Sequence, residues 1–112
     1  SYDDDSFTLE EPTKYTVTLG AFIDKWVAEM YEELDEMFVK DIEKKIADAV
    51  LTIFKTRNDL EVFRKKALYI YIREMTNCET PLLTRVVTVL KEDFYSKYLK
   101  LYENGHIVNK LR

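Results

Sequence analysis

Residues that interrupt regular structure are scarce in this chain, because only 2 glycines and 2 prolines occur among its 112 residues. A fold of many short strands needs such residues at its turns. The sequence therefore favours a few long helices. A composition of 46% apolar and 34% charged residues is typical of a folded globular domain. No apolar run approaches the roughly 20 residues that cross a bilayer, so we expect no membrane-spanning segment.

Apolar residues recur at steps of three and four through residues 21–55. This spacing places them along one side of a helix. The first stripe includes Trp26, Met30 and Met37. One long bent helix or two shorter helices would both fit this segment, and the ordinary helix length of about 11 or 12 residues favours two.

Two further helices are predicted in the second half of the chain. Asn58 is a suitable N-cap and predicts a helix over about 58–75. Thr80 is a second suitable N-cap, and Pro81 would take the first helical position, where its missing N–H costs nothing. The helix that they open is predicted over about 81–103, with the Asn-Gly pair after it as the stop.

The ends of the chain are predicted to be non-helical. Residues 1–20 form an acidic leader followed by an extended arm or edge strand, since Pro12 cannot donate to a sheet. We expect the arm to lie against the helices or to pair with another chain. We expect residues 106–112 to form a short basic turn. The predicted fold is thus all-α, a compact bundle of about four main helices forming a single domain over 21–112, with an extended N-terminal arm.

Charge is divided unevenly between the two halves. Residues 1–63 carry 7 Lys and Arg against 16 Asp and Glu, a net charge of −9, whereas residues 64–112 carry 10 against 5, a net charge of +5. A basic surface attracts polyanions and an acidic surface repels them. The division predicts nucleic acid as the partner of the C-terminal half and protein as the partner of the acidic N-terminal half.

Residues 72–91 resemble a helix-turn-helix motif, without pointing to a particular family. A helix end, a short turn and a capped helix rich in Val, Thr and basic residues follow one another. Asn77 takes the turn position where Gly is usual, and Asn is the next most tolerant residue of a left-handed conformation. The sequence departs from the motif at two positions: Arg73 stands where a small residue normally lets the helices approach, and Thr76 where an aliphatic residue is usual.

The resemblance implies a binding mode for the C-terminal half. In the motif the second helix lies in the major groove, while the first crosses the phosphate backbone. The residues expected to contact nucleic acid are Arg73, Thr80, Thr84, Arg85, Thr88 and Lys91. The alternative is a plain helical bundle, because two consecutive helices also need a turn and Thr-Pro is a common helix start.

Tyrosines are concentrated in the same half of the chain. Tyr95, Tyr98 and Tyr102 recur at helical spacing within the last predicted helix. Such rings pack between helices or at an oligomer interface, which is the favoured interpretation. Alternatively, they stack on single-stranded bases.

Signals for catalysis are missing from the sequence. His106 is the only histidine and Cys78 the only cysteine, and neither zinc-ligand spacing nor a Gly-rich phosphate loop occurs. We therefore expect neither an enzyme nor a metal or cofactor site. A single cysteine cannot form an internal disulfide, which favours an intracellular, reducing compartment.

Two functions fit these observations. The first is a nucleic-acid-binding or transcription-associated module. The alternative is a protein-interaction or oligomerisation domain of a larger protein, without nucleic-acid binding. In that case Trp26, Met30 and Met37 would form the contact stripe, and the chain would associate with a partner or with itself.

Overall fold

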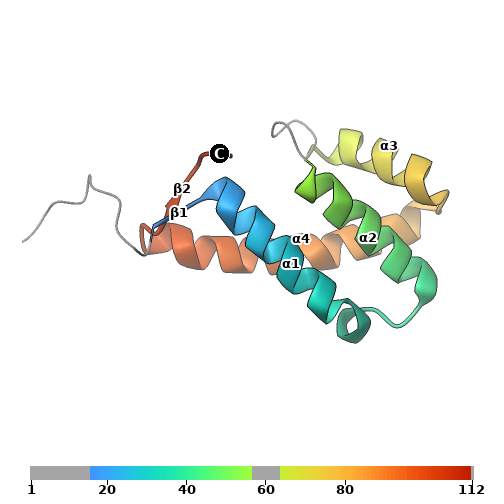
Figure 1. Cartoon of the computed structure of the whole chain (residues 1–112). Helices are drawn as coiled ribbons and strands as arrows, with labels where there is room; N and C mark the ends of the chain where they lie inside the picture. The colour runs from blue at the N-terminus through green and yellow to red at the C-terminus, as the bar shows by residue number, and fades with distance from the viewer. Residues whose placement is uncertain (1–15, 57–63, 112) are drawn as a thin grey trace, which may run out of the picture.

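Four helices dominate the computed structural model, which describes residues 16–56 and 64–111. They are α1 (Leu19–Met37), α2 (Asp41–Lys55), α3 (Lys65–Thr76) and α4 (Thr80–Glu103) (Figure 1). Two strands of two residues each, β1 (Val17–Thr18) and β2 (Ile107–Val108), pair with each other. The predicted all-α fold with four main helices is confirmed. The acidic leader, most of the arm and Asn58 lie outside the described residues.

The first helical segment is divided in two, as its length predicted. Helix α1 ends at Met37, where Phe38 takes an extended conformation and turns its ring into the core. Helix α2 then begins with Asp41 and Glu43 in its first turn, where negative charge interacts favourably with the helix dipole. The Glu43 carboxylate also accepts a hydrogen bond of 3.2 Å from the backbone N–H of Lys40. The break is therefore set by an inward-turning ring and a capped helix start.

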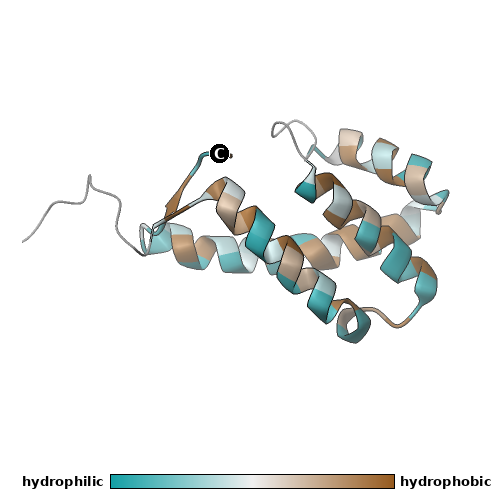
Figure 2. Ribbon diagram, in the orientation of Figure 1, coloured by the Kyte–Doolittle hydropathy of each residue, from teal (hydrophilic) through white to brown (hydrophobic). Residues whose placement is uncertain are grey.

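Helix α2 lies at the centre of the packing and contacts α1, α3 and α4. Helix α4 extends behind the others from one end of the molecule to the other (Figure 1). All four helices supply the large, fully buried side chains: Ile23, Trp26, Met30, Ile46, Val50, Leu51, Leu68, Ile72, Leu83, Val86 and Leu90. Figure 2 shows apolar bands on every helix, interrupted by polar ones, as expected for amphipathic helices.

The contact stripe predicted on the first helix faces inward. Trp26 and Met30 are 1% and 0% exposed, and Met37 is half-buried against the same core. The Trp26 Nε1–H donates a hydrogen bond of 2.9 Å to the Asp93 carboxylate on α4. These side chains join α1 to the rest of the fold, so they do not offer the exposed stripe that the second hypothesis placed there.

The two ends of the described chain meet in a short parallel pairing. Val17 is paired with Ile107, and its N–H donates a bond of 2.8 Å to the carbonyl oxygen of His106. The arm was predicted to contact helices or another chain, and residues 106–112 were predicted to form a turn. The described end of the arm is a short strand, and Val17 lies beside residues of α1 and α4, as predicted. Its pairing with the C-terminal segment of its own chain was not predicted, and strand β2 takes the place of the predicted turn. We call residues 17–20 together with 106–111 the terminal clasp.

Gly20 allows the C-terminal segment to cross the start of α1. Its N–H donates a bond of 2.8 Å to the carbonyl oxygen of Lys110. A Cβ atom on Gly20 would lie 1.8 Å from the carbonyl oxygen of Leu111, closer than any real contact. At the other side of the clasp, α4 ends at Glu103 and Gly105 has a φ of +71°, which confirms the predicted stop.

Candidate nucleic-acid interface

The turn between α3 and α4 has the backbone conformation expected from its sequence. Asn77 has φ 52° and ψ 40°, in the left-handed region, and its N–H closes α3 by donating to the carbonyl oxygen of Arg73 at 2.7 Å. It is the only non-glycine residue with positive φ among those that the structure describes. The prediction for this position is confirmed.

The starts of both helices differ from the sequence prediction. Helix α3 begins at Lys65 after an extended Arg64, and Asn58 lies outside the described residues. The N-cap of α4 is Glu79, with Thr80 already inside the helix and Pro81 in its first turn. Because Thr80 lies inside the helix, its hydroxyl does not act as the N-cap, and it accepts a hydrogen bond from the Arg73 guanidinium.

Hydroxyl groups occupy the contact between the two helices. The buried Thr76 hydroxyl donates to the carbonyl oxygen of Ile72 at 2.7 Å and lies 3.1 Å from Sγ of Cys78. The polar residue that departs from the helix-turn-helix pattern is therefore satisfied. The Tyr69 hydroxyl donates to the hydroxyl of Thr84 on α4 at 3.1 Å. Thr84 is half-buried, so it faces α3 and does not lie on the outer side of α4.

The remaining predicted contact residues are exposed but divided between two sides of α4. Lys91 follows Thr84 by seven residues, on the side that faces α3, and Thr88 lies around the helix between Thr84 and Arg85. Arg85 lies about 120° around the helix from Lys91. It forms an ion pair of 3.1 Å with Glu43 at the start of α2. The Arg85 side chain remains 57% exposed.

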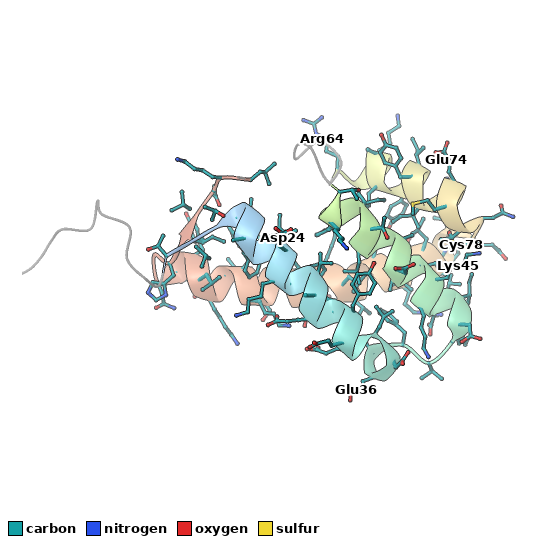
Figure 3. The ribbon with its side chains drawn as sticks, in the orientation of Figure 1. Asp24, Glu36, Lys45, Arg64, Glu74 and Cys78 are labelled. Atoms are coloured by element: carbon teal, nitrogen blue, oxygen red, sulfur yellow. The ribbon has the colours of Figure 1, made fainter. Side chains whose placement is uncertain are left out.

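Positive charge gathers on α3 and the first half of α4. Residues 64–91 carry six Lys and Arg against two Glu, whereas α1 carries one Lys against six Asp and Glu. Lys66 and Arg73, seven residues apart, lie on one side of α3. Neither these two residues nor Lys91 form an ion pair with an acidic side chain within the described ranges. Figure 3 shows Arg64 and Glu74 toward the two ends of α3, and Asp24 and Glu36 toward the two ends of α1.

Lys66 was not among the predicted contact residues, although its spacing from Arg73 could have identified it. Together with Tyr69 and Ile70, these two cations line a hollow of about 460 Å³ on α3. The hollow has an apolar floor with positive charge at its edges. Long cationic side chains beside an apolar floor can shift toward an anion without disturbing the core.

The chain matches no known family model, no curated protein and no solved structure at a significant level. None of the helices described by the structure is sufficiently long and apolar to span a membrane. Within the same residues, no three His, Cys, Asp or Glu side chains are grouped as a metal site would require. The arrangement of cations and hydroxyls on α3 and α4 is the feature that bears most directly on function.

Proposed function

We propose that this protein binds duplex DNA through the outer sides of α3 and of residues 80–91 of α4. We call this the α3–α4 surface and define it by Lys66, Arg73, Thr80, Thr88 and Lys91. The observation that carries the proposal is a left-handed turn between α3 and α4 together with three exposed cations, Lys66, Arg73 and Lys91, that have no acidic partner among the described residues. Cations that are not neutralised within the protein can displace counterions from DNA phosphates.

The dimensions of α4 suit a major groove. A helix with its side chains is about 10–12 Å across, and the groove is about 12 Å wide. Pro81, Arg85 and Thr88 are exposed on the outermost side of the first half of α4. In this proposal, that side enters the groove while Lys66 and Arg73 of α3 contact the phosphate backbone.

Arg85 has a secondary role in this proposal. Its guanidinium already bonds the Glu43 carboxylate at 3.1 Å, and binding to DNA requires that this contact be exchanged for a phosphate or a guanine. The loss of the Arg85–Glu43 contact offsets part of the binding free energy that the new contact with DNA contributes. Arg73 and Lys91 have no such carboxylate to leave within the described ranges, so we expect them to matter more.

The acidic side chains of α1 would help to orient the molecule. Helix α1 carries six carboxylates and one lysine, and a surface of that sign repels phosphate. The protein would therefore approach DNA with the α3–α4 surface facing the DNA and α1 facing away from it. This asymmetry also leaves α1 as the surface for a protein partner.

Fluorescence anisotropy of a labelled duplex at about 50 and 200 mM salt tests the proposal. Three phosphate contacts predict a slope of log affinity against log salt of about −2.7, hence a loss of about 40-fold over this range. Arg73→Ala and Lys91→Ala should each weaken binding and reduce the slope by about 1. Lys25→Ala removes an exposed lysine of α1 and serves as the matched control. The proposal is wrong if the parent does not bind at about 50 mM salt, or if Lys25→Ala weakens binding as much as Lys91→Ala.

A second candidate function, self-association or binding of a protein partner, is favoured by one observation. Ile70, Tyr71 and Met75 on α3 are each between 47% and 48% exposed. Aromatic and Met side chains are enriched at protein interfaces. Sedimentation velocity over a range of concentrations separates the two candidates. A mass that rises with concentration and is lost in Tyr71→Ser/Met75→Ser, without any DNA binding, would establish the second.

A further inference from the structure

A row of stacked tyrosines continues from the α3–α4 surface along α4. Tyr95, Tyr98 and Tyr102 follow Lys91 at steps of four, three and four, which keeps them on one side of the helix. The ring centroids of Tyr95 and Tyr98 are 6.3 Å apart with planes inclined by 15°. Those of Tyr98 and Tyr102 are 5.9 Å apart and inclined by 20°. We call these three residues the tyrosine row.

The outer members of the tyrosine row are exposed, and its middle member is fixed. Tyr95 and Tyr102 are 61% and 58% exposed. Tyr98 is half-buried, stacks on Phe94 with planes inclined by 8°, and donates its hydroxyl to Oδ1 of Asn109 at 3.1 Å. Within the described residues, only the middle ring packs in the way the first part of the favoured interpretation expected, and the oligomer interface stays a prediction. The outer rings present aromatic surface to solvent beside a ring that cannot easily move.

A hollow of about 240 Å³ opens next to the first member of the row. It is lined by Phe54 of α2 and by Lys91, Phe94 and Tyr95 of α4. Three aromatic rings and one cation match the two parts of an unpaired nucleotide, which are a flat base and a phosphate. Aromatic side chains stack on any base, and nearby cations follow the backbone.

We propose that the tyrosine row binds the unpaired nucleotides of a DNA strand that continues from the duplex on the α3–α4 surface. The inference rests on the proposed function, since Lys91 belongs to the α3–α4 surface and also lines the hollow. Tyr95 to Tyr102 span about 10 Å along the helix. At about 3.4 Å for each nucleotide of a strand, the row accommodates about three bases.

The direction of α4 determines where the duplex ends. The helix begins at the turn that the proposed function places at the duplex, and the tyrosine row follows toward its C-terminus. The junction between paired and unpaired DNA would therefore lie near Lys91. A protein partner would also use exposed tyrosines, but a lysine within an aromatic hollow, continuous with a basic surface, favours nucleic acid.

The test compares a blunt duplex with the same duplex carrying a single-stranded extension of six thymines, at either the 3′ or the 5′ end. We expect one of the extended probes to bind the parent protein at least fivefold more tightly than the blunt probe. Tyr95→Ala should remove this gain and leave blunt-duplex affinity unchanged. Tyr95→Phe should keep the gain, because stacking needs the ring and not the hydroxyl. Tyr71→Ala, which removes an exposed tyrosine of α3, is the matched control.

A direct readout of stacking is the fluorescence of 2-aminopurine placed at the first unpaired position. Parent and Tyr95→Phe should quench it, whereas Tyr95→Ala should not. Circular dichroism and thermal unfolding of each variant would verify that the fold is kept, as expected for an exposed side chain.

The possible outcomes separate the two proposals. If the blunt duplex binds but neither extension adds affinity, or if Tyr95→Ala weakens both probes equally, the tyrosine row does not bind single strands. If sedimentation shows that Tyr95→Ala abolishes a dimer, the row is a contact between copies, which also overturns the inference. If the blunt duplex does not bind at about 50 mM salt, the proposed function fails. A Tyr95-dependent affinity for the extended probe would then still establish the row as a binding site.

Discussion

The two halves of α4 are held by different kinds of contact. In the first half, buried Leu83 and Val86 belong to the core that the four helices share, and the hydroxyl groups of Tyr69 and Thr84 link α3 to α4. In the second half, the Phe94 ring centroid lies 5.1 Å from that of Trp26 and 5.8 Å from that of Phe54. The terminal clasp then adds backbone hydrogen bonds beyond the end of the helix.

This difference indicates that the two halves of α4 have different roles: the first half offers contacts to a ligand, and the second half anchors the helix in the fold. Two polar links of the first half, Arg73 to Thr80 and Arg85 to Glu43, are exposed, and they can be exchanged for contacts with a ligand at little cost. The aromatic packing of the second half is buried and resists displacement. The anchored half therefore keeps α4 in place, while the first half presents replaceable polar groups next to the α3–α4 turn.

Trp26→Ala should have the largest effect, because it removes the centre of the aromatic packing. We expect a loss of about 3–5 kcal/mol in the free energy of unfolding. The change also leaves the Asp93 carboxylate with Lys97 as its remaining partner, at 3.0 Å. Urea unfolding followed by circular dichroism measures the loss.

The matched variant Trp26→Phe keeps a ring but removes the N–H donor, and we expect it to cost about 1.5–3 kcal/mol. At a temperature where both variants are folded, DNA affinity should equal that of the parent, because the α3–α4 surface is untouched. A cost below about 1 kcal/mol for Trp26→Ala would contradict the proposed anchoring role of the second half.

Gly20→Ala should have the next largest effect, because it tests the terminal clasp. The new Cβ would overlap the carbonyl oxygen of Leu111, so the C-terminal segment must move away. We expect a loss of about 1–3 kcal/mol, as for other overpacked sites. Amide hydrogen exchange at Val17 and Gly20 should accelerate, while exchange within α3 should not change.

Gly105 provides the comparison for this variant. Its φ of +71° disfavours a side chain, yet a Cβ there would meet no atom within 4 Å. Gly105→Ala should therefore cost about 1–2 kcal/mol through the backbone alone. Gly105→Asn should cost less, since Asn77 already occupies the same region of φ and ψ. If Gly20→Ala left the free energy of unfolding unchanged, the terminal clasp would not contribute to holding the second half of α4 in place.

The features that local spacing determines were predictable from the sequence. The steps of three and four in residues 21–55 predicted the helices, and typical helix length predicted their division. The left-handed turn at Asn77 followed from the conformational preference of one residue. These predictions succeeded because each depends on residues within a few positions of one another.

Features that depend on distant segments could not be predicted. The pairing of Val17 with Ile107 joins the two ends of the described chain, and the sequence of neither segment indicates that it pairs with the other. Arg85 was expected to be free for a ligand, but α2 brings Glu43 beside it. The stripe containing Trp26 had the same spacing whether it was core or surface. Burial was decided by which helices pack together.

Glu43→Gln should have the smallest effect, and it tests whether the links of the first half are replaceable. The pKa of Glu43 is lowered from its ordinary value of 4.5, first by the hydrogen bond from the Lys40 backbone N–H, and further by the Arg85 guanidinium, against partial burial that raises it. A lowered pKa means that the ionised carboxylate stabilises the folded state above about pH 4.5, and that this contribution is lost as the pH falls through the lower value.

The parent should therefore lose more stability between about pH 5 and pH 3 than Glu43→Gln, as measured by urea midpoints across this range. Because the Lys40 N–H is the leading cause, Arg85→Ala should keep most of that pH dependence. Glu43→Gln also releases Arg85 from its carboxylate, so it should tighten DNA binding slightly at neutral pH. Weaker binding in Glu43→Gln would mean that the Glu43–Arg85 pair positions Arg85 for its ligand, and that at least one surface link of the first half is structural and not replaceable.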